Sequence, residues 1–373
     1  MPIKIIHTAD NHLGISFRHY PEEVRKLLLQ ERLDALKVLV DEGNSRKAHF
    51  MVIAGDLFDK VNVGKAIIED AADVLKRFEG EAVLVLAGNH DFYEGTESTL
   101  WQRFRKATEG SCVQALLHLE PEQFSIDDQE VIFYPCPCPS KYGTEPVIGW
   151  VKNVEKKAGA IHIGIAHGNV ESLGLDNDNR YFNMNERELI GAGLHTWLLG
   201  HIHVAAPAPG IRGKQPYYMA GIHAPDSVKC TRPGHAWYLE FEADGSIMHA
   251  ALHPGKLSFK RITRELRNAN DIEALRQECE AIGLEHVLLD LQLSGRLAEE
   301  DLEQLSTTID ELRKKSLHLS EERDIHPVLD AEAIEKLFPG GTLPHRLLND
   351  LAADADHPED VHLALELIKE LRP

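Results

Sequence analysis

The most constraining feature of this sequence is a recurring combination: a short apolar run, followed at once by Asp, Asn or His beside glycine. It occurs five times, at residues 10–14 (DNHLG), 55–59 (GDLFD), 88–91 (GNHD), 167–168 (HG) and 200–203 (GHIH). Such an apolar run predicts a buried strand, and glycine lets the backbone turn sharply after it. Because α/β sheets place their sites at the carboxyl ends of strands, we expect these loops to converge on one point.

The apolar runs alternate with helical periodicity in the N-terminal part. Strands are predicted at residues 3–6, 50–54 and 82–87, separated by helices over 21–43, with Gly43 as a C-cap, and over 63–78. This order predicts a parallel sheet with right-handed crossovers. Further strands are predicted at 131–134, 161–166, 197–199, 217–220, 236–241 and 247–252, the last three at hairpin spacing. We expect residues 1–258 to form one two-layered α/β domain whose later half is mainly antiparallel.

The pattern changes after Pro254 and Gly255. A helix over 272–282, a strand over 289–293 and a helix over 302–312 predict a compact α-β-α module at residues 259–330. Residues 331–373 are predicted to form a helical tail. The formal net charge is −20, of which −13 falls in residues 261–373. This asymmetry indicates a separate acidic unit.

Composition excludes several classes of protein. Hydrophobic residues make up 43% of the chain, which is ample for a core and argues against wholesale disorder. No apolar run reaches the roughly 18 residues that a membrane span needs, and the N-terminus has no signal-peptide pattern. The cysteines are five in number and scattered. A disulfide framework is therefore not expected, and the protein is predicted to be cytoplasmic.

The chemistry of the five loops points to metal ions. Their donors are His, Asp and Asn without Cys, a mixture that suits Mn²⁺, Fe²⁺ or Zn²⁺. The donors are too many for one ion but fit two ions that share a bridging carboxylate. Two metals about 3.5–4 Å apart can clamp the attacking and leaving oxygens of a phosphoryl displacement and activate a bridging water. Taken singly, such residues often only cap turns, but five in this order favour a site.

The order of the motifs (D-x-H, G-D, G-N-H-D, H-G, G-H-x-H) resembles the calcineurin-like metallophosphoesterase superfamily. Three segments are similar in sequence to its SbcD-type branch of DNA double-strand-break repair nucleases: residues 7–14 (HTADNHLG), 54–59 (AGDLFD) and 199–203 (LGHIH). The resemblance implies an α/β fold: a two-sheet sandwich flanked by helices, with a small C-terminal α/β capping domain and a helical tail.

The resemblance also implies roles for single residues. It implies two divalent ions, Mn²⁺ first and Mg²⁺, Fe²⁺ or Zn²⁺ as alternatives, with these ligands: Asp10, His12 and His203 for one ion, Asn89, His167 and His201 for the other, and Asp56 between them. His90 would stabilise the transition state or protonate the leaving oxygen. Asp91 would hydrogen-bond to His90 and orient it.

The substrate contacts follow the family less closely. Residues 220–225 (AGIHAP) stand where the family usually carries a Pro-Gly-Ser segment near the DNA, so the substrate groove differs here. Arg18, His19 and His223 are candidate substrate-binding residues. Helices over 63–78 and 99–106 are candidates for a homodimer contact. Apolar faces at 343–351 and 361–371 either dock on the coiled coil of an SbcC-like SMC-family ATPase, as the resemblance implies, or pack on their own chain.

The leading hypothesis is a Mn²⁺-dependent DNA exonuclease and endonuclease, the catalytic subunit of an SbcCD-like repair complex. A phosphodiesterase or phosphatase acting on nucleotides or phosphoproteins is the second hypothesis. The third is a weakly catalytic metal-binding scaffold for an ATPase partner. The acidity argues against a general basic surface for nucleic acid, so DNA binding would depend on the metals, local loops and a partner.

Overall fold

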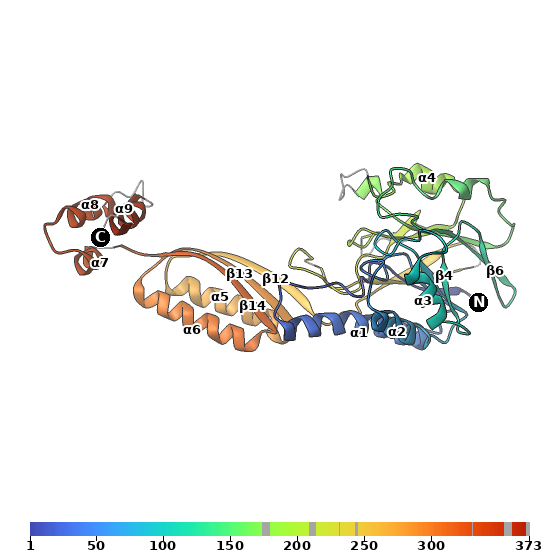
Figure 1. Cartoon of the computed structure of the whole chain (residues 1–373), viewed down its shortest axis with the longest axis horizontal. Helices are drawn as coiled ribbons and strands as arrows, with labels where there is room; N and C mark the ends of the chain where they lie inside the picture. The colour runs from blue at the N-terminus through green and yellow to red at the C-terminus, as the bar shows by residue number, and fades with distance from the viewer. Residues whose placement is uncertain are drawn as a thin grey trace. The chain divides into compact units, whose positions relative to one another are not determined.

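The computed structural model describes residues 1–173, 180–208, 214–230, 232–242, 245–329, 331–353 and 360–370. The chain divides into two compact units, Met1–Ser258 and Phe259–Pro373 (Figure 1). Each apolar cluster lies within one of the two units. Among the described residues, no helix combines the length and the apolar character that crossing a bilayer requires.

The first unit begins with a six-stranded sheet in the order β11-β10-β1-β2-β3-β4. Its strands are β1 (Ile3–Thr8), β2 (Phe50–Ile53), β3 (Ala82–Leu86), β4 (Val113–Leu116), β10 (Ala236–Phe241) and β11 (Ile247–Leu252). The first four run parallel, as predicted, and β10 joins β1 antiparallel. The connecting helices α1 (Glu22–Arg46), α2 (Lys65–Leu75) and α3 (Thr99–Ala107) contribute, with one face of this sheet, to one apolar cluster.

Helix α1 passes through Gly43 and ends at Arg46, so the predicted C-cap at Gly43 is wrong. The C-cap is Lys47, whose φ of 54° is left-handed. Gly43 serves packing instead, because a Cβ there would lie 2.9 Å from the ring of Phe78. A glycine at a close approach and a glycine at a helix end look alike in sequence.

The second sheet has the order β5-β6-β7-β8-β9. Its strands are β5 (Glu122–Ile126), β6 (Gln129–Cys136), β7 (Ile161–His167), β8 (Thr196–Gly200) and β9 (Tyr217–Met219). Only β5 and β6 are antiparallel, and β6 to β9 are parallel throughout. The prediction of a mainly antiparallel later half is therefore wrong for this sheet. The connections between β6 and β9 are too long for hairpins and serve as crossovers. They include the short helices η1 (Gly149–Asn153), η2 (Glu171–Leu173) and α4 (Glu186–Gly191).

The two sheets pack face to face. The apolar cluster between them takes Ile5, Val52 and Leu84 from the first sheet and Phe133, Ile163 and Leu198 from the second. All six are fully buried. The predicted two-sheet sandwich flanked by helices is confirmed, and its geometry brings the carboxyl ends of β1, β2 and β3 near those of β7 and β8.

The second unit contains a three-stranded sheet in the order β12-β13-β14. Its elements are β12 (Ser258–Leu266), α5 (Ala269–Ile282), η3 (Leu284–His286), β13 (Val287–Leu297), α6 (Glu299–Lys315) and β14 (His318–Pro327). Helices α5 and α6 share one apolar core with this sheet. The structure therefore adds two outer strands, β12 and β14, that the predicted α-β-α module did not include. These strands carry long charged stretches, and their apolar alternation is too weak to be recognised from sequence.

Three further helices follow in the second unit: α7 (Ala331–Leu337), α8 (Leu343–Ala352) and α9 (Asp360–Glu370). They bury a small apolar cluster of their own, which includes Ile334, Phe338, Leu348 and Leu365. The tail predicted for residues 331–373 is thus helical over its described part, with an internal core.

Candidate metal centre

The five loops come together where the ends of both sheets meet. The loops that follow β1 and β2 continue the parallel pairing of these strands, because Asp10 N donates to Gly55 O and His12 N donates to Asp56 O. The second sheet is tied to the first by His201 N, which donates to the Asp10 carboxylate at 3.0 Å. The loops predicted to converge do so.

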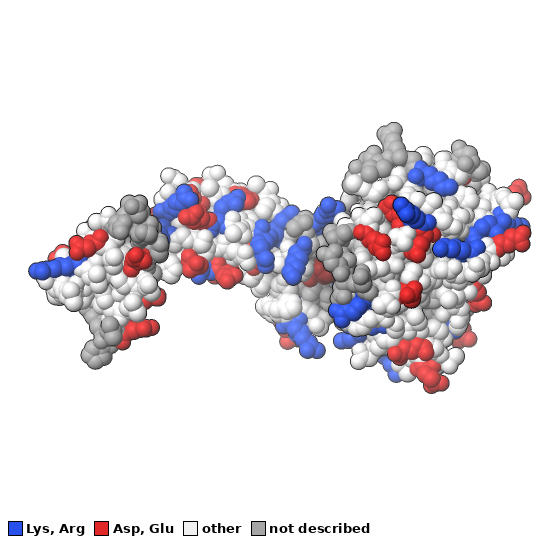
Figure 2. All heavy atoms as spheres, turned by 90° about the horizontal axis from the view of Figure 1, so that it is seen from above, with Lys and Arg blue, Asp and Glu red and all other residues white. Residues whose placement is uncertain are grey.

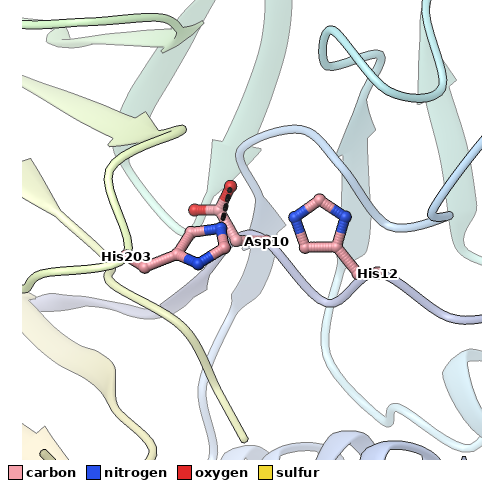
Figure 3. Close-up of side chains that lie close together, drawn as sticks. All are labelled: Asp10, His12 and His203. Atoms are coloured by element: carbon pink, nitrogen blue, oxygen red, sulfur yellow. Dashed lines mark ion pairs between the residues drawn. The ribbon is translucent and has the colours of Figure 1, made fainter. Parts of the chain in front are cut away.

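One group of donors consists of Asp10, His12 and His203, whose ligand atoms lie within 4.8 Å of one another (Figure 3). His203 Nε2 is 3.9 Å from Asp10 Oδ1. Both Asp10 and His12 are buried, whereas the His203 side chain is 39% exposed. His203 is therefore the solvent-exposed member of this group.

A second group of donors surrounds His167. Its Nε2 lies 3.0 Å from Asn89 Oδ1 and 3.3 Å from Asp56 Oδ2. The same Asn89 oxygen is 3.3 Å from His201 Nδ1. Asp56 also approaches the first group, because its Oδ2 is 3.7 Å from His12 Nε2. Asp56 thus lies between the two groups.

The donor set fits divalent cations. Asp10 and Asp56 are almost completely buried, and a buried carboxylate needs a compensating charge. The side chains that face them are imidazoles and an amide, which are ligands that borderline divalent metals accept. The residues of the centre could therefore hold divalent metal ions.

The backbone of the ligand loops is unusual. Asp10, His12 and Asp56 have φ values of 55°, 42° and 55°, and His201 has a φ of 100°. Left-handed conformations at residues other than glycine cost on the order of 1–3 kcal/mol each and cluster at functional sites. Gly88 is required for a different reason, since a Cβ there would overlap the Asp56 carboxylate.

Electrostatics inside the centre follow from burial and from the histidines. Burial opposes ionisation of Asp56, but the neighbouring His167 and His12 hold its pKa below its ordinary value. Burial alone would lower the pKa of His167, yet the charges of Asp56 and Asp10 raise it to about 9. Without a cation, a proton on His167 would therefore take the compensating role, and metal binding would release it.

His90 lies beside these donors, 4.7 Å from His12 between ring centroids, and is partly exposed. Its ring is oriented by the main chain, because Nδ1 is 2.9 Å from Asp59 O. The prediction that Asp91 orients His90 is wrong. The Asp91 carboxylate accepts hydrogen bonds from Gly88 N at 2.7 Å and Phe58 N at 3.0 Å. It fixes the two ligand loops, and burial, together with the Asp56 charge, raises its pKa to about 7.

The predicted substrate contacts have different surroundings. Arg18 and His19 are exposed in the loop that follows His12, and their role stays a prediction. His223 is fully buried, and its Nε2 is 2.8 Å from Arg32 O. It therefore cannot contact a substrate, and that prediction is wrong.

Arg32 of α1 is a residue that the sequence did not single out. It is 1% exposed, and all three of its guanidinium nitrogens donate to main-chain carbonyls: Asn11 O at 2.7 Å, Asp10 O at 3.1 Å and Ala224 O at 3.0 Å. It links the first ligand loop to Ala224. An arginine within an amphipathic helix gives no sequence signal of such a role.

Asp226 is the second residue missed from the sequence. Its Oδ2 lies 3.4 Å from Nδ1 of His203, the nitrogen on the other side of the ring from the one that faces Asp10. Burial would raise its pKa, but His203 and Arg32 lower it to about 2. A carboxylate behind a ligand histidine fixes the ring and raises its basicity.

We therefore expect Asp226→Ala to weaken Mn²⁺ binding about 10- to 100-fold, the usual cost of losing such a carboxylate. Asp226→Asn keeps an oxygen that can accept from Nδ1 and is expected to lose less. Calorimetric titration of each variant with Mn²⁺ measures the affinity. Equal affinity in wild type and Asp226→Ala would show that Asp226 does not act through His203.

The buried His223 makes a prediction about pH. Burial and the nearby Arg32 lower its pKa from 6.5 to about 3, so the fold favours its neutral form. The stability it contributes is present above pH 6.5 and is lost as the pH falls toward 3. At about pH 5 the loss is about 2 kcal/mol. The free energy of unfolding is measured with urea, in the presence of EDTA, at about pH 7 and about pH 5. Its fall between the two pH values should be smaller in His223→Gln than in wild type by this amount. An equal fall in both proteins contradicts a neutral buried His223.

Comparison with known proteins gives the family. The calcineurin-like phosphoesterase family matches residues 3–205, more than half of the chain, and the chain belongs to this family. The chain is 23% identical over 351 residues to the uncharacterized metallophosphoesterase YhaO of Bacillus subtilis, covering 88% of this chain and 82% of YhaO. It is 23% identical to the DNA double-strand break repair protein Mre11 of Aeropyrum pernix, over 69% of this chain and 62% of that one.

Among solved structures, TT1561 of Thermus thermophilus aligns with a TM-score of 0.41 and 8% identity, covering 67% of this chain and 99% of that chain. The resemblance to the calcineurin-like superfamily is confirmed, and the protein is a phosphoester hydrolase by family.

Proposed function

We propose that this protein is a metal-dependent DNA nuclease, both exonuclease and endonuclease, that acts in double-strand-break repair as the catalytic subunit of an SbcCD-like complex. The observation that carries the proposal is the convergence of seven His, Asp and Asn side chains from two sheets on one centre, with His90 beside them. The relative from Aeropyrum pernix is named a double-strand break repair protein, which supports DNA as the substrate.

Two divalent ions, preferably Mn²⁺, would polarise the phosphodiester and supply a hydroxide nucleophile near neutral pH. Asp10, His12 and His203 would hold one ion and Asn89, His167 and His201 the other, with Asp56 shared. His90 would act as the proton donor. The Asp59 carbonyl can only accept, so Nδ1 carries a hydrogen and Nε2 is the atom that can exchange a proton. A protonated His90 can give that proton to the leaving oxygen.

The charge distribution supports binding that does not depend on a basic surface. Figure 2 shows lysines and arginines interspersed with acidic side chains over the visible face of both units. The first 260 residues carry a net charge of −7. We infer that the phosphodiester is held by the metal centre, by adjacent loops and by a partner.

The proposed partner is an SbcC-like SMC-family ATPase, docked on the C-terminal helices. Helices α8 and α9 leave leucines exposed although they bury others against each other: Leu343 is 79% exposed and Leu363 is 59% exposed. Leu347 and Leu367 lie one turn further along the same helices and are also exposed. Exposed leucines at this spacing favour an apolar partner such as a coiled coil. A homodimer through α2 and α3 is part of the same proposal.

The second candidate function keeps the chemistry and changes the substrate to nucleotides or phosphoproteins. It is favoured by residues 220–225, which are all buried and stand where the family usually carries a Pro-Gly-Ser segment near the DNA. The third candidate function is the weakly catalytic scaffold. It requires that the metal-loaded centre does not hydrolyse phosphodiesters.

The test is hydrolysis by the full chain with Mn²⁺ of four substrates: duplex DNA ends, single-stranded DNA, cyclic nucleotides and bis(p-nitrophenyl) phosphate. The proposal expects DNA cleavage that EDTA abolishes. Cleavage of cyclic nucleotides in preference to DNA favours the second function. A metal-loaded protein that leaves even the activated phosphodiester intact favours the scaffold.

A further inference from the structure

Two segments, residues 141–143 and 180–182, meet beside the metal centre. Together they are called the rim. Gly143 N donates to Arg180 O and Phe182 N donates to Gly143 O, both at 2.8 Å. The rim is also joined to the centre itself, because Asn89 Nδ2 donates to Lys141 O at 3.4 Å. The position of the rim is therefore fixed by the same loops that carry the ligands.

The side chains of the rim form a line of rings that leads from the centre to solvent. The Tyr181 ring lies 4.9 Å from the ring of His201, and the Tyr142 ring lies 5.6 Å from that of Tyr181. Tyr142 is 48% exposed. Two cations lie near its ring, with the Lys141 ammonium 5.7 Å and the Arg180 guanidinium 5.6 Å from its centroid.

An exposed aromatic ring with two cations nearby is well suited to a nucleotide. Nucleobases stack on tyrosine irrespective of sequence, and nearby lysine and arginine neutralise the phosphates that follow. The cation–π contacts alone are worth little at an exposed position. Since a phosphate at the metal centre would lie two ring contacts away from Tyr142, a base attached to that phosphate can reach the ring.

We propose that this rim, with Tyr142 as its stacking platform, binds the unpaired nucleobase next to the phosphate that is hydrolysed. The proposal rests on the proposed function in so far as the substrate is a nucleotide or a nucleic acid. A base can come from single-stranded DNA or from a free nucleotide, and the two sources share this chemistry. A phosphoprotein would not use the platform.

The experiment measures binding by fluorescence anisotropy, using metal-loaded His90→Gln protein so that hydrolysis does not interfere. The probes are a labelled oligothymidylate, the same oligomer with abasic sites, and unlabelled thymidine monophosphate as competitor. Tyr142→Ala in this background is expected to weaken oligothymidylate binding about tenfold or more, since one stacked base is lost. Tyr142→Phe keeps the ring and should bind as tightly as the parent. Leu119→Ala removes an equally exposed side chain elsewhere and serves as the matched control.

Three results would overturn the platform: no oligothymidylate binding by the parent protein, equal binding by Tyr142→Ala, or equal binding of the abasic oligomer. Competition by thymidine monophosphate that is equally weakened by Tyr142→Ala supports the platform and identifies a free nucleotide as a source. The proposed nuclease is judged separately, by DNA cleavage in wild type. If wild type cleaves DNA but Tyr142→Ala binds oligothymidylate as tightly as the parent, only the platform is contradicted. If Tyr142→Ala weakens binding but wild type does not cleave DNA, only the nuclease is contradicted.

Discussion

Asp56→Asn is expected to lower metal-dependent phosphodiester hydrolysis by on the order of 10³-fold or more, the loss of several kcal/mol of metal-derived transition-state stabilisation. Asp56 is the residue that approaches both donor groups, at 3.7 Å from His12 and 3.3 Å from His167. An amide has no charge and cannot join two cations as a carboxylate does. The fold should survive, because the hydrogen bond from His90 N to Oδ1 can be kept by the amide oxygen.

The measurement is kcat/KM for bis(p-nitrophenyl) phosphate over a Mn²⁺ titration. Asp70→Asn, which removes an exposed carboxylate from α2, is the matched control and should behave as wild type. Full activity in Asp56→Asn would contradict a shared role for this carboxylate. A loss that high Mn²⁺ restores completely would mean that Asp56 tunes affinity only.

His90→Gln is expected to reduce kcat about 10²- to 10⁴-fold, the range for loss of a general acid. The number of bound Mn²⁺ ions should not change, because the resemblance assigns His90 no metal. The reduction should be larger for DNA than for bis(p-nitrophenyl) phosphate, because p-nitrophenolate leaves without needing a proton.

The geometry makes this a sharp test, since the ligand atoms of His90, His12 and Asp56 lie within 4.8 Å of one another. Loss of one bound Mn²⁺ in His90→Gln would make His90 a ligand and not an acid. An equal reduction for both substrates would assign it to stabilising the charge of the transition state.

The sequence was sufficient to predict the parts of the fold and site that are local. Each ligand follows its own strand, so Asp10, Asp56 and Asn89 could be placed at one sheet edge by counting strands. The parallel order of β1 to β4 followed from the alternation with helices. These inferences need only short-range patterns.

The remaining features depend on contacts between distant parts of the chain. Asp226 reaches His203 from a loop beyond β9, and Arg32 joins Asp10 to Ala224, which is 192 residues away from Arg32 in sequence. No local pattern marks such contacts. The assignment of Asp91 failed for a related reason, because a neighbour in sequence is not a neighbour in space: its carboxylate binds Phe58 N and Gly88 N.

The pairing of strands was the other source of error. Strand β9 was expected in an antiparallel hairpin with β10, but it pairs parallel with β8 in the second sheet, and β10 pairs with β1 in the first. An apolar run predicts a buried strand but not which strand it pairs with, so the hydrophobic pattern could not distinguish the two placements. The edge strands β12 and β14 were missed because one face of each is charged and exposed.

The central claim is that the five loops form one centre for two divalent ions. Anomalous diffraction at the manganese edge from crystals soaked in Mn²⁺ tests it most directly. The account predicts two anomalous peaks, one among Asp10, His12 and His203 and one among Asn89, His167 and His201, with Asp56 contacting both. A single peak, or peaks away from these side chains, would contradict it.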